Sequence, residues 1–338
     1  ALLLADCRPA PREDKNPGAG AKVTESGRDV AVEPAPPPGP GESAAALPAP
    51  RYGHWGARWS EEATQFRVHA PMAREISVWI YRNAMVPMPD AEFVLMRTSD
   101  GSFEGERTGN LDGHTYCYVL RHDDGRTSKL ADPFATHLVA NGTRCLIVRP
   151  GASDPPGWRN HARPKPPASP LDTIIYETHV RDFTMHAQSG ATAKGSYLGF
   201  AESPTTIAGK PGGQPTGLDY LKYLGVTHIH LMPVMEFEND EAKRGYNWGY
   251  MTSGWFSPEG MFASNPDNGS RVTELKQLIM ATHAHGIGVI MDVVFNHAGH
   301  SSPLQALGGP RYFRTWPDGK WSNASHCGND LKTEDPWV

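Results

Sequence analysis

The chain has no long hydrophobic run and no strong charge of either sign. No segment reaches the roughly 18 consecutive apolar residues of a membrane-spanning helix, so we expect no transmembrane span. The formal net charge of −5 and the pI near 6.3 give no basic footprint for nucleic acid. These absences argue against a helical membrane protein and against a nucleic-acid-binding protein.

Cysteine is also scarce, with four in 338 residues. They are scattered, without a CxxC pair or another spacing typical of metal ligands, so no metal centre is expected. Cys117 and Cys145 are compatible with one disulfide in an exported protein and equally with two free buried thiols. Leu2–Cys7 resembles the end of a signal segment before a lipidated cysteine, and an arbitrary fragment start is the alternative. A secreted or lipid-anchored bacterial protein and a cytoplasmic protein both remain open.

The composition changes along the chain and predicts several domains. Residues 1–50 are rich in Pro, Ala, Gly and charge, as in Pro34–Pro40, so they bury too little apolar surface to offset their ordering entropy. We predict a disordered tail or linker there. A second proline-rich stretch, residues 151–171, is predicted to be a linker between two folded domains.

Residues 51–150 show the period-two alternation of half-buried strands. Thr64–Ala70 and Ile76–Tyr81 alternate apolar and polar residues, and further strands are expected at Thr115–Leu120 and Arg144–Val148. Turn dipeptides such as Asp100-Gly101 lie between the strands. This pattern predicts an all-β, immunoglobulin-like sandwich.

Residues 172–338 have a different rhythm of buried strands and amphipathic helices. Strands are predicted at Thr173–Val180, Val226–Val234 and Val289–His297, with helices at Gly217–Gly225 and Val272–Gly286 between them. Apolar strands alternating with helices are typical of a parallel sheet built from βαβ units. A complete (β/α)8 TIM barrel needs about 250 residues. We therefore predict the N-terminal part of such a barrel, followed by a loop after the third strand.

The third predicted strand ends in the polar residues Asp292, Asn296 and His297. The carboxyl ends of barrel strands are where α/β barrels carry their chemistry. This end of the strand is therefore the candidate site.

Four segments resemble, in order, motifs of the starch-debranching members of the α-amylase superfamily (glycoside hydrolase family thirteen). Tyr176–Phe183 resembles their first barrel strand, Tyr246–Tyr250 the loop after the second strand, and Asp292–His297 the first signature of the superfamily. Ser325–Asp330, with Thr333-Glu334, is similar to the loop ahead of their fourth strand. Type I pullulanases are most similar; isoamylases, glycogen-debranching enzymes and branching-type enzymes are alternatives, and Met251-Thr252 resembles the isoamylase-type loop. The sandwich is similar to a family forty-eight carbohydrate-binding module.

The resemblance implies a retaining glycoside hydrolase that cleaves α-1,6 branch linkages in pullulan, starch or glycogen. His297 would bond a hydroxyl of the −1 glucose, Tyr250 would stack beneath that ring, and Asp292 would orient groups at the floor of the site. Asn296 and Trp248 are further candidates for binding the α-glucan substrate. Asn296 lies near a calcium site in some relatives, but no complete set of oxygen ligands is seen, so no cofactor is predicted. Oligomeric state stays open.

No catalytic set is complete in this sequence, because the family's segments with the nucleophile Asp and the acid Glu have no match. Glu177 lies in the middle of a strand, whereas the acid of the family comes from the fifth strand. We therefore expect the chain alone to be inactive. The alternative is a carbohydrate-binding or scaffold polypeptide acting through the sandwich, with Trp55, Trp59 and Trp79 as a candidate aromatic strip.

Overall fold

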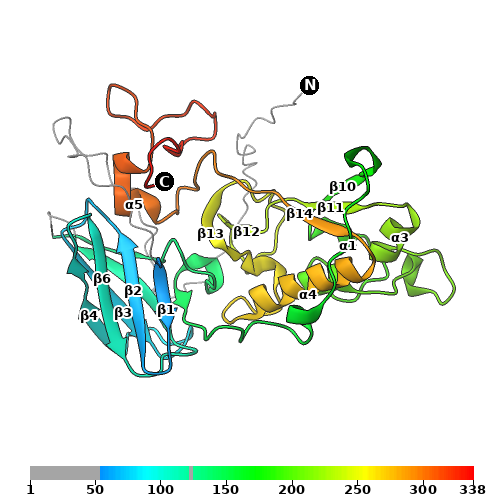
Figure 1. The fold of residues 1–338 in the computed structure, drawn as a ribbon, viewed down its shortest axis with the longest axis horizontal. Helices are drawn as coiled ribbons and strands as arrows, with labels where there is room; N and C mark the ends of the chain where they lie inside the picture. Colours follow the sequence, from blue (N-terminus) through cyan, green and yellow to red (C-terminus); the bar gives the residue numbers. More distant parts are fainter. Residues whose placement is uncertain (1–53, 122–124) are drawn as a thin grey trace, which may run out of the picture.

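The computed structural model describes residues 54–121 and 125–338. The predicted tail of residues 1–50, with Cys7, lies outside the described residues. Within the described part, a β-sandwich lies beside a short parallel sheet with its helices, and the C-terminal loop lies over one end of the sandwich (Figure 1). None of the helices described here is long and apolar enough to cross a bilayer.

The sandwich consists of two antiparallel sheets, as predicted. One has the order β1 (Gly56–Trp59), β2 (Ala63–His69), β6 (Ser102–Thr108), β5 (Met96–Arg97). The other has the order β4 (Ala91–Val94), β3 (Glu75–Tyr81), β7 (Thr115–Arg121), β8 (Thr127–Leu130), and β9 (Cys145–Leu146) also pairs with β7. Alternate residues such as Phe66, Val68, Ile76 and Val78 are fully buried between the sheets, which confirms the period-two reading.

The two sandwich cysteines are free thiols. Cys145 pairs with Tyr116 in the β7–β9 register and lies in the core between the sheets, where its sulfur accepts a hydrogen bond from the Asp132 backbone N–H (3.0 Å). Cys117, one residue along β7, faces the opposite side and packs against Tyr81. The disulfide alternative is therefore wrong, because the two sulfurs lie on different faces of one sheet.

The second body contains the predicted parallel sheet. Its strands are β10 (Ile175–Thr178), β11 (His228–Leu231) and β14 (Gly288–Met291), in that order. The helices are α1 (Asp182–Met185), α2 (Tyr197–Ala201), α3 (Gly217–Tyr223) and α4 (Ser270–Ala284). Gly286, with φ of +79°, ends α4 where predicted. The predicted order of a sandwich followed by parallel strands with helices is confirmed.

One face of the parallel sheet is covered by helices, and the other is open. Ile229 and Leu231 point to the face packed by α3 and α4 and are completely buried among Leu218, Leu221 and Leu278. Ile175 points to the other face and is 54% exposed. The side chains of Glu177 and His230 lie on this open face as well.

Three features differ from the expectation. The third strand ends at Met291 rather than at His297, because the chain beyond it finds backbone partners outside the parallel sheet. A bulged hairpin, β12 (Met235–Phe237) and β13 (Thr252–Pro258), was not predicted. The segment after His297 contains a short helix, α5 (Leu304–Gly308), where only a loop was expected. Short 3-10 helices occur at Ala140–Gly142, Trp158–Asn160, Pro170–Asp172, Ile207–Gly209, Gly260–Phe262 and Gly309–Arg311.

Candidate functional site

A row of polar side chains crosses the open face of the parallel sheet. Oε1 of Glu177 lies 3.9 Å from Nδ1 of His230, and Nε2 of His230 lies 4.0 Å from Oδ2 of Asp292. The strand register brings these side chains together. His230 on β11 pairs with Glu177 on β10 and with Ile290 on β14, and Asp292 lies two residues after Ile290, on the same face. His230 was not predicted as a site residue. The signal was present in the alternation of His228-Ile229-His230-Leu231, which puts both histidines on the face opposite the core.

Asp292 is held between two neighbouring segments. Its backbone N–H donates to the Leu231 carbonyl (3.0 Å), which fixes it just past the end of β14. Its Oδ2 accepts a hydrogen bond of 2.8 Å from the Tyr250 hydroxyl. Burial, together with this hydrogen bond to a carboxylate, raises the pKa of Tyr250 above its ordinary value, so the hydroxyl remains a donor. The carboxylate therefore fixes the orientation of the Tyr250 ring.

His297 lies on the other side of Tyr250. Its Nε2 is 2.8 Å from the Tyr250 carbonyl, and its Nδ1 is 3.1 Å from the Asn296 side-chain amide nitrogen. A carbonyl only accepts and an amide N–H only donates, so Nε2 carries the proton and Nδ1 accepts. The ring is 4% exposed. Both ring nitrogens thus have partners within the chain. A hydrogen bond from His297 to a sugar hydroxyl stays a prediction, and it requires the hydroxyl to replace one of these two partners.

Trp248 lies on the loop that ends at Tyr250, and its side chain is 49% exposed. Asn247 shapes this loop, because its side chain donates to the Glu238 carbonyl (2.8 Å) and accepts from the Gly249 N–H (2.9 Å). Gly249 has φ of +86°, and a Cβ there would lie 2.9 Å from the Pro233 carbonyl oxygen, so only glycine fits. The loop is therefore rigid on both sides of the exposed Trp248 ring.

The predicted site residues Tyr250, Asp292, Asn296 and His297 are brought together by segment 292–299. On one side of it, Trp255 Nε1 donates to the Val294 carbonyl (2.6 Å) and Gly299 N–H to the Thr252 carbonyl (2.7 Å). On the other side, the backbone of this segment pairs with the C-terminal loop through the His297–Asp330 bridge. These bonds explain why the chain leaves the parallel sheet after Met291.

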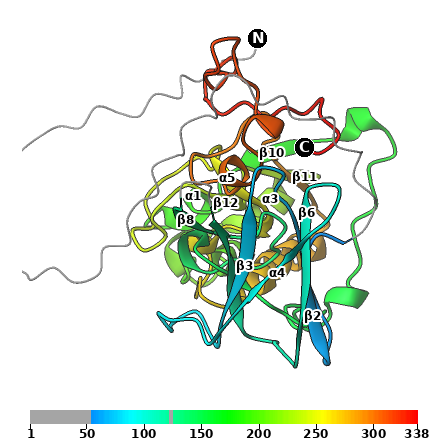
Figure 2. The same cartoon turned by 90° about the vertical axis from the view of Figure 1, so that its left-hand side faces the viewer.

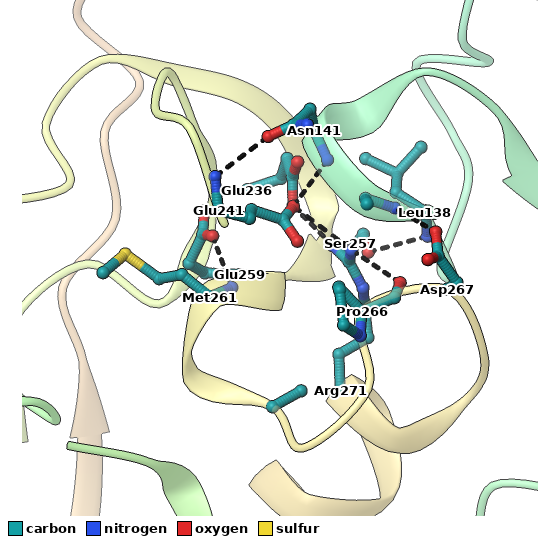
Figure 3. A network of polar contacts seen from close by, with 12 residues as sticks. Leu138, Asn141, Glu236, Glu241, Ser257, Glu259, Met261, Pro266, Asp267 and Arg271 are labelled. Atoms are coloured by element: carbon teal, nitrogen blue, oxygen red, sulfur yellow. Dashed lines mark hydrogen bonds and ion pairs between the residues drawn. The ribbon is translucent and has the colours of Figure 1, made fainter. Parts of the chain in front are cut away.

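A buried acidic cluster lies outside this site and is the one group among the described residues with metal-like spacing. Ligand atoms of Glu236, Glu241 and Glu259 lie within 4.8 Å of one another (Figure 3). Arg271, completely buried, donates to Glu236 and Glu241 and to the carbonyls of Pro258 and Pro266. Burial, with the charge of Glu241, raises the pKa of Glu259 to about 7. The Arg271 guanidinium balances one carboxylate, and burial raises the pKa of Glu236 as well as that of Glu259, so protonation removes further negative charge and the cluster does not fit a calcium ion.

The sandwich tryptophans do not form one strip. Trp59 lies on β1 and bonds Asn110, whereas Trp79 lies on β3 in the other sheet beneath Lys129. Trp55 is stacked on Phe134 and contacts Trp337 of the C-terminal loop. The three side chains therefore offer no common platform for a polysaccharide.

Comparison with known protein families gives matches in both bodies. Residues 54–135 match carbohydrate-binding module 48 (isoamylase N-terminal domain), and residues 198–306 match the alpha amylase catalytic domain. Together with the sandwich, the parallel strands and the Asp292–His297 signature, these matches define the class. The chain belongs to the α-amylase superfamily of glycoside hydrolases.

The individual relatives include pullulanases, an isoamylase and glycogen debranching enzymes. The pullulanase of Bacillus subtilis (strain 168) is 38% identical over 288 residues, covering 83% of this chain and 38% of that protein. Isoamylase 1, chloroplastic, of Arabidopsis thaliana is 31% identical over 272 residues, covering 71% of this chain and 31% of the isoamylase. The structure of pullulanase from Paenibacillus barengoltzii complexed with maltotriose superposes with a TM-score of 0.81 and 36% identity, covering 86% of this chain and 46% of that one. The chain thus spans less than half the length of the relatives it matches.

Proposed function

We propose that this chain forms the sugar-holding half of the −1 subsite of a retaining hydrolase that cleaves α-1,6 branch linkages in α-glucans. The observation that carries the proposal is the Tyr250–Asp292 hydrogen bond at the carboxyl end of the parallel strands. It braces an aromatic ring beside a carboxylate, and an aromatic face is the surface on which a sugar ring stacks. Trp248, exposed on the same loop, supplies a second aromatic face.

The proposed division of labour follows from the chemistry of retaining glycosidases. They need a nucleophilic carboxylate and a carboxylic acid about 5–5.5 Å apart across the scissile bond. Glu177 and Asp292 are not such a pair in our proposal, because His230 lies between them and Asp292 is occupied by Tyr250. No segment of the sequence resembles the family's nucleophile or acid segments. We therefore propose that the 338-residue chain binds glucan and does not hydrolyse it.

The proposed substrate is supported by the relatives. The Paenibacillus barengoltzii pullulanase has been solved with maltotriose and with maltohexaose and α-cyclodextrin. For the present chain we propose an α-glucan of the pullulan type, with isoamylase-like specificity as the alternative because of Met251-Thr252. We also propose the division into a sandwich at residues 51–150, a linker at 151–171 and a partial barrel at 172–338.

Calorimetric titration with maltotriose tests the proposed binding. Tyr250→Ala removes the ring and should weaken the affinity about two- to tenfold, since one aromatic stacking contact contributes about 0.5–1.5 kcal/mol. Tyr223→Ala is the matched control, because Tyr223 is an exposed tyrosine on α3 at 77% exposure. Equal affinities for the wild type and Tyr250→Ala, or no binding by the wild type, would refute the proposed subsite. Reducing ends released from pullulan above background would refute the proposed lack of hydrolysis.

A further inference from the structure

The C-terminal loop, residues 309–338, is anchored to the sandwich by one tyrosine. The Tyr312 hydroxyl donates to the backbone carbonyl of His69 (3.0 Å) and lies 2.5 Å from Nδ1 of the same residue. Because the hydroxyl proton goes to the carbonyl, Nδ1 of His69 must be the donor in the second bond. The His69 ring also stacks on Trp337 at a centroid distance of 3.7 Å. The last residue of β2 is thus held by two points of a loop more than 240 positions away.

The apolar contacts of the loop continue the core of the sandwich. Tyr312, Phe313 and Leu331 are all at most 5% exposed and belong to the same buried cluster as Phe66 and Val68. In both views the loop lies over the end of the sandwich, on the side away from α4 (Figures 1 and 2). Burial of this kind fixes the loop against the sandwich rather than against the parallel sheet.

From its anchor the loop reaches the candidate site through backbone pairing. Lys332 N–H donates to the Tyr312 carbonyl (2.8 Å), which ties the anchor to the strand-like stretch Asn329–Leu331. Leu331 N–H donates to the Asn296 carbonyl (3.1 Å), and Ala298 N–H to the Asn329 carbonyl (3.2 Å). His297, between these two bonds, contacts the Tyr250 carbonyl.

A buried carboxylate keeps this stretch of the loop rigid. Asp330, 2% exposed, accepts hydrogen bonds from Ser322 (2.5 Å), Ser325 and the Ala324 N–H (2.7 Å). Burial alone would raise its pKa, but these hydrogen bonds hold the pKa of Asp330 below its ordinary value. A displacement of the anchor is therefore transmitted along the loop instead of being absorbed by it.

We propose that His69 and Tyr312 are positioning residues for glucan binding: the sandwich sets the place of Asn296–Ala298, and through His297 that of Tyr250. The sandwich then acts on the site by holding a loop, independently of any sugar that it binds itself. This inference rests on the proposed function only in taking α-glucan as the ligand of the Tyr250 site.

Two tyrosines of the sandwich core make a matched test possible. Tyr312→Phe removes the oxygen that joins the loop to His69 and keeps the buried ring. Tyr118→Phe removes an equally buried hydroxyl, which donates to Asp132 (3.0 Å) and has no part in the loop contact. Asp132 keeps the Tyr116 hydroxyl (2.6 Å) in that control, which loses one buried hydrogen bond, whereas Tyr312→Phe loses both bonds between the loop and His69.

The experiment is a maltotriose titration of the wild-type 338-residue chain and both variants, with thermal unfolding of each. We expect Tyr312→Phe to weaken the affinity about fivefold, the effect of about one hydrogen bond on an equilibrium constant. Tyr118→Phe should leave the affinity unchanged while lowering the melting temperature. In spectra of protein with 15N-labelled histidine, the His297 Nε2–H signal should shift in Tyr312→Phe and stay in Tyr118→Phe.

The outcomes separate this inference from the proposed function. Absence of maltotriose binding by the wild type refutes the proposed function. Binding by the wild type with equal affinities for Tyr312→Phe and Tyr118→Phe refutes the positioning role and leaves the proposed function standing. If Tyr312→Phe does not fold, His69→Phe is used instead, because it keeps the stacking on Trp337 and loses the Nδ1 bond. An unchanged affinity in that variant equally refutes the role.

Discussion

The hydroxyl of Tyr250 and the carboxylate of Asp292 are joined by a hydrogen bond of 2.8 Å. It connects the loop between β12 and β13 to the first residue beyond β14, so two βα units share one contact at the carboxyl edge of the sheet. Because Asp292 is also fixed by the Leu231 carbonyl, the ring of Tyr250 is the movable partner that this bond immobilises.

Removing only the Tyr250 hydroxyl should distinguish the effect of the bond that orients the ring from the effect of stacking between the ring and a sugar. We expect Tyr250→Phe to lower the free energy of unfolding by about 0.5–1.5 kcal/mol, because one hydrogen bond is lost and Asp292 retains access to water. Maltotriose affinity should fall less than in Tyr250→Ala, since the ring remains. Urea unfolding and calorimetry measure both effects. A loss of affinity as large as in Tyr250→Ala would show that stacking is not the main contribution of the ring.

The buried Arg271 should be essential for the hairpin β12–β13. Arg271→Met leaves Glu236 and Glu241 buried without their cation, and breaking a buried pair in this way costs about 3–5 kcal/mol. Arg159→Met is the control: this guanidinium is 74% exposed in its pair with Asp154, and such pairs contribute about 0–1 kcal/mol. Denaturant unfolding of both variants compares the losses. Similar losses would contradict the assignment of Arg271 as the neutralising group.

The same cluster predicts a dependence of stability on pH. Burial and the charge of Glu241 raise the pKa of Glu259 from 4.5 to about 7 in the folded protein. Between these values the folded state binds more protons at Glu259 than the unfolded chain, so this residue's contribution to stability declines as pH rises from about 4.5 to about 7. Glu259→Gln should remove that decline. The difference in unfolding free energy between the variant and the wild type, measured across this range, would stay constant if Glu259 titrated normally.

The open face and edge of the parallel sheet should cause self-association. Ile174, Ile175, Val293 and Phe295 are each between 44% and 59% exposed around the sheet. Exposed apolar groups beside an unpaired strand edge favour association between chains. We expect light scattering to rise with concentration, and the double variant Ile175→Thr, Phe295→Ser to reduce it. Met85→Ser, a change of an isolated methionine at 80% exposure in the sandwich, should have no effect. Equal scattering by all three proteins would exclude the sheet as the cause.

The sequence predicted those elements whose residues carry a regular period. Alternation in Ile76–Tyr81 and the spacing of Leu275 and Leu278 depend on one element and its neighbours, and both elements formed as expected. The end of β14 could not be read in this way, because it is set by Trp255, Thr252 and the C-terminal loop. The sequence around His230 indicates only a strand residue. The two carboxylates near its ring come from distant segments, Glu177 on β10 and Asp292 just beyond β14.

Burial caused by contacts between distant segments could not be predicted from the sequence either. Arg271 lies on the buried face of α4, four residues before Leu275, and the hydrophobic pattern does not indicate an arginine there. Its burial follows from Glu236 on β12, Glu241 in the loop after it and Glu259 just past β13. Tyr312 and His69 are separated by 243 positions, and no local pattern indicated their contact. Both features depend on how the sandwich and the barrel segment pack together, which a single sequence does not encode in any periodicity.

The central claim is that Tyr250 and its neighbours hold a glucose unit, and a crystal structure of this chain with maltotriose tests it most directly. We predict one sugar ring stacked on Tyr250, with Trp248 and His297 around it and Asp292 still bonded to the tyrosine. Maltotriose bound only on the sandwich, with the Tyr250 ring uncovered, would contradict the account.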